Sequence, residues 1–375
     1  MKEWYYPTAF NSWGQDEMDA AMRVLMSGRF TQGERVALFE REFADYHGRR
    51  YGVMCNSGSS ANLLMVAALK ELGAFKPGDK AIVPAVAWST TYAPLVQHGL
   101  DLVVIDIDET WNANPELFRH DPGNIKVVVA CSILGNPAYL AEWQNVAGVL
   151  GAAMIEDNCE SLGAVTHAGR KTGTFGIMSS ASFFWSHQIG AVEGGMVLTD
   201  DPECNFVLRM LRAHGWTRDV DNAKIGFEDE YDFRVMGYNV RALELHAAIA
   251  REQLKKLPAM IDMRQKNCRT FWEEAAHLVG PPPLQNGWVS PFGIQFEVAG
   301  SHTRQALADA LREARIDCRL PTGGSFLRHA YGAPWRNQST PVADRLHDRG
   351  MFLGNGPLDL TEHIGRAVEV MRKVL

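Results

Sequence analysis

The first two-thirds of the chain alternate short, continuous apolar runs with segments of helical periodicity. A helix-like stretch, SSANLLMVAALKEL, follows the first of these runs. Continuous apolar runs between helices are typical of strands that are buried on both faces of a largely parallel sheet. We therefore expect an α/β architecture, with helices on both faces of a mostly parallel sheet. The predicted strands are YGVMC (51–55), AIVPAV (81–86), LVVIDI (102–107), IKVVVACSIL (125–134), GAAMIED (151–157), ASFFW (181–185) and GGMVLTD (194–200).

The pattern changes in the last third of the chain. Residues 241–277 have helical periodicity, and Pro258 is expected to break or kink that helix. The stretch VGPPPLQNGWVSP predicts a loop, and FGIQFEV, TRQALADALREA and DCRL then predict a strand, a helix and a second strand. We expect a large α/β domain over residues 1–255 and a smaller C-terminal α+β domain over residues 256–375.

Charge and hydropathy restrict the partners. The chain has 375 residues and a net charge of -7, which argues against a nucleic acid or an anionic membrane as the main partner. The N-terminal stretch has no apolar segment typical of a secretory signal. There is also no run of about 18 apolar residues for a membrane span. We expect a cytoplasmic protein that binds neither nucleic acid nor membrane.

The six cysteines are scattered and form no C-x-x-C pair. Disulfide pairing is not expected in a chain of cytosolic character. Metal sites and iron–sulfur clusters usually require more closely spaced ligands. The expectation is therefore reduced thiols and no metal ion.

One candidate site is NSGSSAN, residues 56–62. A predicted strand ends there, small residues turn the chain, and a helix begins. Unpaired N–H groups at the start of a helix can bind a phosphate, with Gly58 allowing close approach and Ser59 adding a hydroxyl. Simple capping of the helix explains the motif equally well.

Two further candidates follow predicted strands. Asp157 and Glu160 come after an apolar run, at the strand end where open α/β sheets bind ligands. An acid there could pair with a protonated ring nitrogen or merely cap a helix. Ser182 and His187 lie in SASFFWSHQIGAVEGGMV, and a lone histidine in this position could be purely structural.

Taken together, the motifs carry a resemblance to a known family. The chain resembles the DegT/DnrJ/EryC1/StrS sugar aminotransferases from Tyr6 to its C-terminus. This resemblance implies the fold-type I architecture of enzymes that depend on pyridoxal phosphate. The motifs, in the order typical of the family, are NSGSSANLL, VPAVAWSTTYAPL, IEDNCESLGA, SFFWSHQIGAVEGGMVLTDD, RAHGWTR and GYNVRALE.

One position departs from the usual family pattern. Typical members carry, at the position of His187, the lysine that binds the cofactor covalently, and no lysine lies between Lys171 and Lys224. A histidine there resembles the GDP-4-keto-6-deoxy-D-mannose 3-dehydratase subgroup. Another histidine-bearing subgroup, the CDP-sugar 3-dehydrases, uses an iron–sulfur cluster held by four cysteines, and this chain lacks that cysteine cluster.

The resemblance implies roles for individual residues. His187 is the implied catalytic residue, since an imidazole can take and return protons near neutral pH but cannot replace the lysine's covalent bond. The implied contacts of the pyridoxal or pyridoxamine 5'-phosphate are Gly58, Ser59 and Ser182 at the phosphate, Asp157 at the pyridine nitrogen, Trp88 on the ring, Glu160 at its edge, and Asn239 at the phosphate of a neighbouring subunit. Weaker candidates for contact with sugar, glutamate or nucleotide are Ser186, His214, Arg241 and Arg319.

The implied activity is removal of the C3 hydroxyl from a nucleotide-linked 4-keto-6-deoxyhexose, with L-glutamate as amino donor. A homodimer with shared active sites is implied as well. Two alternatives stay open. The chain could be a nucleotide-sugar 4-aminotransferase that tolerates the missing lysine, or a catalytically inactive homologue that only binds ligands.

Overall fold

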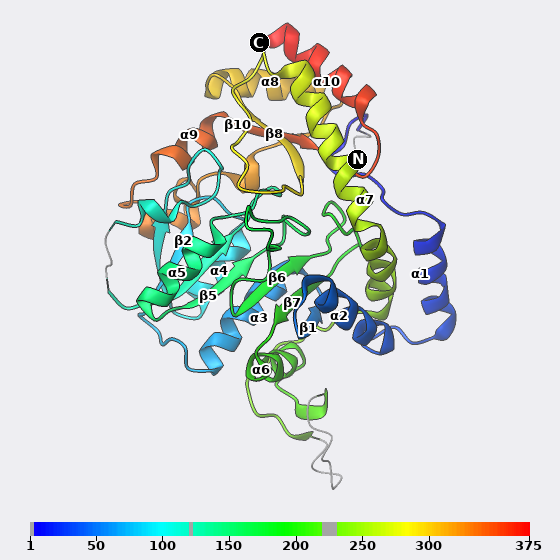
Figure 1. The fold of residues 1–375 in the computed structure, drawn as a ribbon, viewed down its shortest axis with the longest axis vertical. Helices are drawn as coiled ribbons and strands as arrows, with labels where there is room; N and C mark the ends of the chain where they lie inside the picture. The colour runs from blue at the N-terminus through cyan, green and yellow to red at the C-terminus, as the bar shows by residue number, and fades with distance from the viewer. Residues whose placement is uncertain (1–3, 120–122, 220–230) are drawn as a thin grey trace.

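A seven-stranded sheet forms the centre of the molecule. We used a computed structural model, which describes residues 4–119, 123–219 and 231–375 (Figure 1). The order of the strands is β1-β7-β6-β5-β4-β2-β3, and β7 alone runs antiparallel to its neighbours. The predicted mostly parallel α/β sheet is confirmed. The strands are β1 (Tyr51–Cys55), β2 (Lys80–Pro84), β3 (Asp101–Ile105), β4 (Ile125–Cys131), β5 (Ala153–Asp157), β6 (Met178–Ser182) and β7 (Gly195–Thr199).

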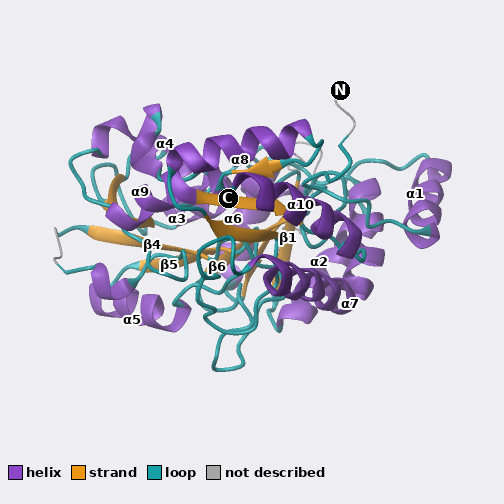
Figure 2. Cartoon of the chain, turned by 90° about the horizontal axis from the view of Figure 1, so that it is seen from above, coloured by secondary structure: helices purple, strands orange, loops and turns teal. Residues whose placement is uncertain are grey.

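Helices cover both faces of this sheet (Figure 2). In β4, Val127 and Val129 pack in one apolar cluster, whereas the alternate residues Val128 and Ala130 pack in another, with Trp143. This alternation follows from the two-residue period of a strand. The first cluster includes residues of α3 (Gly58–Glu71), α4 (Ser89–Gln97) and α6 (Pro202–Arg212), and α2 (Glu34–His47) and α5 (Leu140–Leu150) pack on the opposite face.

A second, three-stranded sheet with the order β8-β10-β9 lies at the top of Figure 1 and is antiparallel. Tyr6 packs in its core and donates a hydrogen bond from its hydroxyl to the carbonyl of Gly354 (2.8 Å). The N-terminal segment therefore belongs structurally to the C-terminal sheet. The elements are β8 (Gly293–Glu297), α8 (Ser301–Glu313), β9 (Cys318–Arg319), α9 (Pro341–Arg349), β10 (Gly350–Gly354) and α10 (Thr361–Val374).

The long helix α7 (Glu244–Ala275) connects the two parts. Leu257 packs in the core beneath the large sheet, and Phe271 packs in the core of the small sheet. Of the expected break or kink at Pro258, the break is wrong, because the helix continues through this residue, and the kink stays a prediction. Pro258 is exposed, so the carbonyl that loses its partner can be hydrated. The predicted domain boundary between residues 255 and 256 falls within this helix and stays a prediction.

One predicted strand is displaced. ASFFW was expected as a strand, whereas β6 is Met178–Ser182, and Phe183 already lies in the following loop. The segment MSSAS is fully buried although it is rich in serine, so its sequence does not read as an apolar run. Its small side chains allow α3 to pack closely on β6. The shift makes Ser182 the last residue of the strand.

Several smaller features complete the fold. Helix α1 (Gln15–Ser27) packs on α7. The six cysteines are unpaired, as expected.

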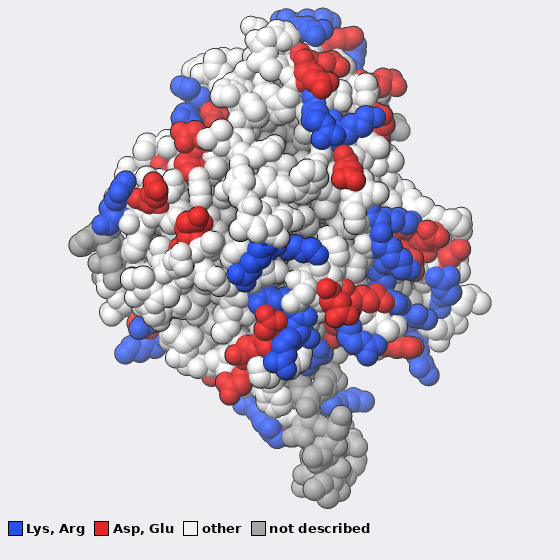
Figure 3. Space-filling model, in the orientation of Figure 1, with Lys and Arg blue, Asp and Glu red and all other residues white. Residues whose placement is uncertain are grey.

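Among the described residues no helix is both long and apolar enough to cross a membrane. Positive and negative side chains are interspersed on the face drawn in Figure 3. Short 3-10 helices occur at Pro115–Leu117, Thr217–Asp219, Pro321–Gly323, Phe326–Arg328 and Ala330–Trp335.

Candidate active site

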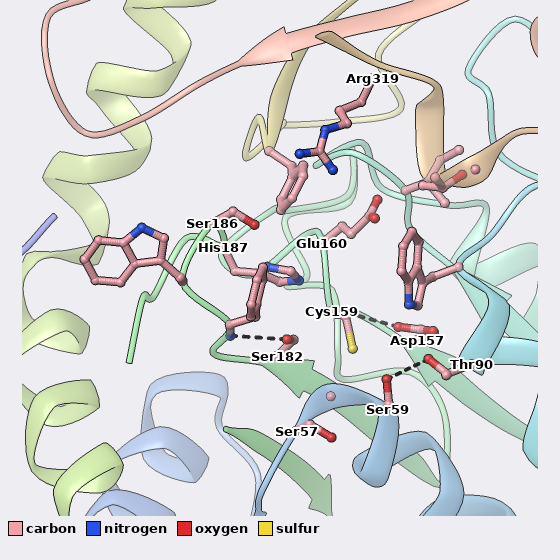
Figure 4. Close-up of a pocket in the computed structure, with 18 of the residues that line it drawn as sticks. Ser57, Ser59, Thr90, Asp157, Cys159, Glu160, Ser182, Ser186, His187 and Arg319 are labelled. Atoms are coloured by element: carbon pink, nitrogen blue, oxygen red, sulfur yellow. Dashed lines mark hydrogen bonds between the residues drawn. The ribbon is translucent and has the colours of Figure 1, made fainter. Parts of the chain in front are cut away.

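A cavity of about 750 Å³ opens where the carboxyl ends of β4, β5 and β6 meet the start of α3. Ligand sites in open α/β sheets are usual at this edge. Figure 4 shows side chains from these strand ends and from the small sheet converging on the cavity. Nine of the predicted site residues line it: Gly58, Ser59, Trp88, Asp157, Glu160, Ser182, Ser186, His187 and Arg319.

The start of α3 combines a cap with free N–H groups. The hydroxyl of Ser57 accepts a hydrogen bond from the N–H of Ser60 (3.1 Å), which is ordinary capping. The N–H groups of Gly58 and Ser59, in the first turn, have no acceptor within the helix. A Cβ on Gly58 would lie 2.6 Å from the Cβ of Ser182. The glycine therefore allows the helix start to lie against the end of β6, which leaves a compact site for a phosphate.

Asp157, at the end of β5, is oriented by its neighbours. Its Oδ2 accepts hydrogen bonds from Asn62 Nδ2 (2.8 Å) and from Thr91 Oγ1 (2.7 Å). Its Oδ1 has only longer contacts, with the N–H of Cys159 (3.2 Å) and with Ser180 Oγ (3.4 Å). The carboxylate is fixed through one oxygen, which leaves the other able to accept a stronger bond from a charged donor.

His187 lies in the loop after β6, among aromatic rings. Its imidazole meets Phe292 edge-on at 4.9 Å and Phe184 at 6.0 Å. Its Nδ1 is buried and has no hydrogen-bond partner. Burial, with a smaller contribution from the charge of Arg264, lowers the pKa of His187 to about 3. The imidazole is therefore neutral at physiological pH, and its burial makes it a weaker base than an exposed imidazole.

Glu160 is shifted in the opposite direction. Its Oε2 accepts a hydrogen bond from the N–H of Leu134 (2.8 Å). Burial nevertheless raises the pKa of Glu160 to about 7, and the charge of Asp157 acts in the same direction. A neutral histidine and a carboxyl group that holds its proton near pH 7 thus line the same cavity. Opposite shifts of this kind are typical of sites for proton transfer.

Arg319 presents a cation at the wall formed by the small sheet. Its Nη2 and Nε lie 3.1 and 3.3 Å from Oδ2 of Asp317. The same oxygen accepts a hydrogen bond from Thr8 Oγ1 (3.0 Å). The guanidinium is mostly exposed and faces the cavity (Figure 4). An oriented, accessible guanidinium of this kind is suited to bind a carboxylate or a phosphate.

Three predicted residues do not line the cavity of this chain. The side chain of Asn239 is exposed, and Arg241 Nη1 lies 2.6 Å from His214 Nε2. Their segment nevertheless runs beside the phosphate site, because the N–H of Asn56 donates to the carbonyl of Val240 (3.0 Å). Asn239 is predicted to act at the phosphate of a neighbouring subunit, and the roles of all three residues stay predictions.

Sequence reasoning missed several residues of the site. Asn62 and Thr91 hold Asp157, and Thr90 Oγ1 lies 2.8 Å from Ser59 Oγ. A signal was present for Asn62, which follows Gly58 by four residues and so shares its helix face. Cys159 was seen only as one scattered thiol, although it lines the cavity.

Neither a lysine in the cavity wall nor a cluster of metal ligands is found among the described residues. Among the described residues that line the cavity, none is a lysine. Across the described part of the chain, no group of three or more His, Cys, Asp and Glu side chains is placed to hold a metal ion.

Comparison with known proteins adds a family and solved relatives. The model of the DegT/DnrJ/EryC1/StrS aminotransferase family matches residues 11–372. The chain is 39% identical to a GDP-4-keto-6-deoxy-D-mannose 3-dehydratase of Yersinia pseudotuberculosis, with 98% of each protein covered. It is similar to the E. coli GDP-4-keto-6-deoxy-D-mannose-3-dehydratase with bound hydrated PLP (TM-score 0.92, 38% identity, 99% of this chain and 100% of that chain covered).

A third relative shows the cofactor with an amino acid. The chain is similar to a structure of GDP-4-keto-6-deoxymannose-3-dehydratase with a trapped PLP-glutamate geminal diamine. The TM-score is 0.90 at 37% identity, over 98% of this chain and 100% of that chain. The likeness extends over both sheets, so it includes every element that contributes to the cavity.

Proposed function

From the premise that the chain belongs to the DegT/DnrJ/EryC1/StrS aminotransferase family, we propose that it is a pyridoxal phosphate-dependent 3-dehydratase. The substrate is a nucleotide-linked 4-keto-6-deoxyhexose of the GDP-4-keto-6-deoxymannose type, and L-glutamate is the amino donor. The relatives named GDP-4-keto-6-deoxy-D-mannose 3-dehydratase support this substrate, since they match over nearly the whole chain.

One observation carries the proposal. His187 lies in the cavity where typical family members have a lysine, and no lysine is among the described residues that line it. The protein therefore has no amine of its own there to bind the cofactor covalently. A neutral imidazole takes the place of that amine, which retains proton transfer and removes covalent capture.

The residues present fit the cofactor. The N–H groups of Gly58 and Ser59 and the hydroxyl of Ser182, which line the cavity, would hold its phosphate. The freer oxygen of Asp157 is placed to accept a bond from the protonated pyridine nitrogen, and Trp88 offers an exposed ring for stacking. When bound as its amine, the cofactor supplies the group that captures the C4 ketone and a ring that accepts electrons.

His187 performs the proton transfers. Because Nδ1 is buried, Nε2 is the nitrogen that remains to exchange protons in the cavity. It takes up the proton that elimination releases, and it returns a proton to the C3 hydroxyl, which leaves as water. The raised pKa of Glu160, about 7, leaves this group partly protonated, so it does not add a full negative charge beside the imidazole.

The overall reaction balances without a further oxidant or reductant. L-glutamate gives 2-oxoglutarate and ammonia, and this oxidation releases the two electrons and two protons that the sugar needs. The sugar loses its C3 hydroxyl as water and gains a hydrogen at that carbon. The water formed in elimination equals the water consumed in releasing ammonia, so none appears in the sum.

We also propose a homodimer in which each subunit completes the partner's site. Large apolar side chains are exposed on α1, where Met22 and Met26 are 57% and 81% exposed, and near Asn239, where Met236 is 94% exposed. Exposed apolar surface of this extent is typical of protein interfaces. Light scattering should give the mass of two chains; a monomer that is fully active would contradict this arrangement.

A cytoplasmic location is retained as a prediction.

The experiment that tests the function is an assay with a panel of sugar nucleotides. GDP-, CDP- and dTDP-linked 4-keto-6-deoxyhexoses are each incubated with the holoenzyme and L-glutamate, and ammonia and 2-oxoglutarate are measured. We expect both products to form in equal amounts with the GDP-linked sugar. Formation of 2-oxoglutarate without ammonia would favour the 4-aminotransferase, and no conversion of glutamate at all would favour the inactive homologue.

A further inference from the structure

A buried arginine lies directly behind His187. Arg264 belongs to α7, between Ile261, which packs under the large sheet, and Phe271, which packs under the small sheet. Only 3% of its surface is exposed. Its Nη2 donates to the backbone carbonyls of His187 (3.2 Å) and Ser186 (3.5 Å). The guanidinium therefore contacts the backbone of the segment that carries the catalytic histidine, and Arg264 is not among the residues that line the cavity.

The same guanidinium also contacts the small sheet. Its Nη1 donates to the carbonyls of Phe292 (3.0 Å), Asn355 (3.1 Å) and Pro291 (3.3 Å). The ring of Phe292 in turn packs edge-on against the imidazole of His187. One side chain thus connects the catalytic loop, the residues before β8 and the residue after β10. Both the backbone of His187 and the ring that packs on it depend on this connection.

The charge of Arg264 has no opposite partner in the part of the chain that the structure describes. No ion pair among the described residues involves it, and its Nε is buried without a hydrogen-bond partner. Backbone carbonyls solvate it only partly, and burial lowers the pKa of Arg264 to about 10. A buried cation without a carboxylate destabilises a fold. The positive charge is therefore costly for stability alone, which points to a use in the site.

We propose that Arg264 is a positioning residue for the catalytic step, which fixes the loop of His187 against the small sheet and whose positive charge acts together with burial against protonation of the imidazole. This proposal rests on the proposed function, in which His187 is the base. Arg264 acts through His187 and does not itself line the cavity.

Other charged groups face His187 from the cavity side. Asp157 ends β5 and Glu160 follows it, whereas Glu193 precedes β7 and Arg319 belongs to β9. Three of these four groups are acids, and a negative charge would favour the protonated imidazole. Among them and Arg264, Arg264 is the charge that lowers the pKa of His187. Removing Arg264 should therefore raise the pKa of His187 toward its ordinary value.

Two substitutions separate the charge from the geometry. Arg264→Met removes the charge and the donors, so we expect the midpoint of His187 protonation to rise by about one pH unit or more. Arg264→Lys keeps the charge but loses the planar guanidinium, whose two NH2 groups bond to both segments. In that variant the midpoint should stay near that of the wild type, whereas kcat should fall about tenfold to a hundredfold because the base is misplaced.

The direct measurement is a histidine NMR titration of the cofactor-free protein, with the His187 signal assigned by its loss in His187→Asn. The matched control is Asn267→Ala. Asn267 is buried on the same helix and bonds to Asn355 and to the carbonyl of Leu358, but has no bond to the His187 loop. This control should lose stability and leave the titration unchanged. The acid limb of the kcat/KM profile should move upward in Arg264→Met alone.

The outcomes are distinct. An unchanged His187 titration in Arg264→Met, or an equal shift in Asn267→Ala, overturns the proposal. If Arg264→Met does not fold, Arg264→Lys decides, since wild-type kcat in that variant overturns the positioning role. Failure of the proposed function has another signature, because the wild-type protein would then release no ammonia when given L-glutamate and the sugar substrate. Ammonia release by the wild type together with unaltered Arg264 variants would reject the Arg264 proposal alone.

Discussion

His187→Asn is expected to bind the cofactor as the wild type does and to lose dehydration by about a hundredfold to ten-thousandfold, the usual contribution of a general acid–base group. Asparagine has nearly the shape of the imidazole's inner half, so the aromatic surroundings of the side chain are largely kept. It cannot accept a proton near neutral pH. Cofactor binding is measured by an absorbance titration, and dehydration by ammonia release in the presence of L-glutamate and the GDP-linked 4-keto sugar.

The control for this variant is His167→Asn, at an exposed histidine of the same chain that does not line the cavity. It should retain wild-type rates in both assays. If His187→Asn dehydrated the sugar within about threefold of the wild-type rate, another base would have to perform the transfer, and the role given to His187 would be wrong.

Asp157→Asn is expected to weaken cofactor binding by about a hundredfold or more, because it removes the negative partner of a buried positive charge. The hydrogen-bond pattern adds to the loss. Asn62 and Thr91 both donate to Oδ2 of the carboxylate. Asparagine has one oxygen for these two donors, so its NH2 group would face the protonated ring nitrogen, donor against donor.

The dissociation constant is measured by fluorescence or absorbance on the cofactor-free protein. Conversion of glutamate to 2-oxoglutarate should fall as well, even at saturating cofactor, because the ring then withdraws electrons less well. Asp262→Asn, at an exposed position on α7, is the matched control. Cofactor affinity of Asp157→Asn equal to that of the control would contradict the proposed contact with the pyridine nitrogen.

Much of the large sheet could be predicted from hydrophobicity, because its strands are buried on both faces and read as continuous apolar runs. Strand β6 was displaced by three residues since it consists largely of serine. Its burial depends on packing against α3, which is a tertiary effect. Similarly, α7 continues through Pro258 because that residue lies on an exposed face, which the sequence alone does not reveal.

The residues of the site likewise include some that the sequence pattern predicts and others that depend on tertiary contacts. Residues at strand ends and at the start of α3, such as Gly58 and Asp157, could be predicted since topology brings those ends to one edge of the sheet. Asn62, Thr91 and Arg264 could not. They act through contacts across the fold: Arg264 reaches the His187 loop from a helix 77 residues further along the chain.

The meaning of His187 came from a comparison and not from a local pattern. Read by itself, the residue was a histidine after a strand, and a structural role was an adequate explanation. The resemblance to the family showed that typical members have a lysine at this position. The structure adds that the imidazole is neutral and that no lysine is among the described residues lining the cavity. The account therefore depends on the fate of the glutamate nitrogen.

Following the amino nitrogen of glutamate is the most direct test of the proposed function. The holoenzyme is incubated with L-glutamate carrying an isotopic label on its amino nitrogen and with GDP-4-keto-6-deoxymannose, and the products are separated and analysed by mass spectrometry. The account predicts that the label is recovered as free ammonia, while the sugar nucleotide has lost one oxygen and contains no label. Labelled nitrogen at C4 of a sugar that keeps its C3 oxygen would contradict it, since the chain would then be an aminotransferase.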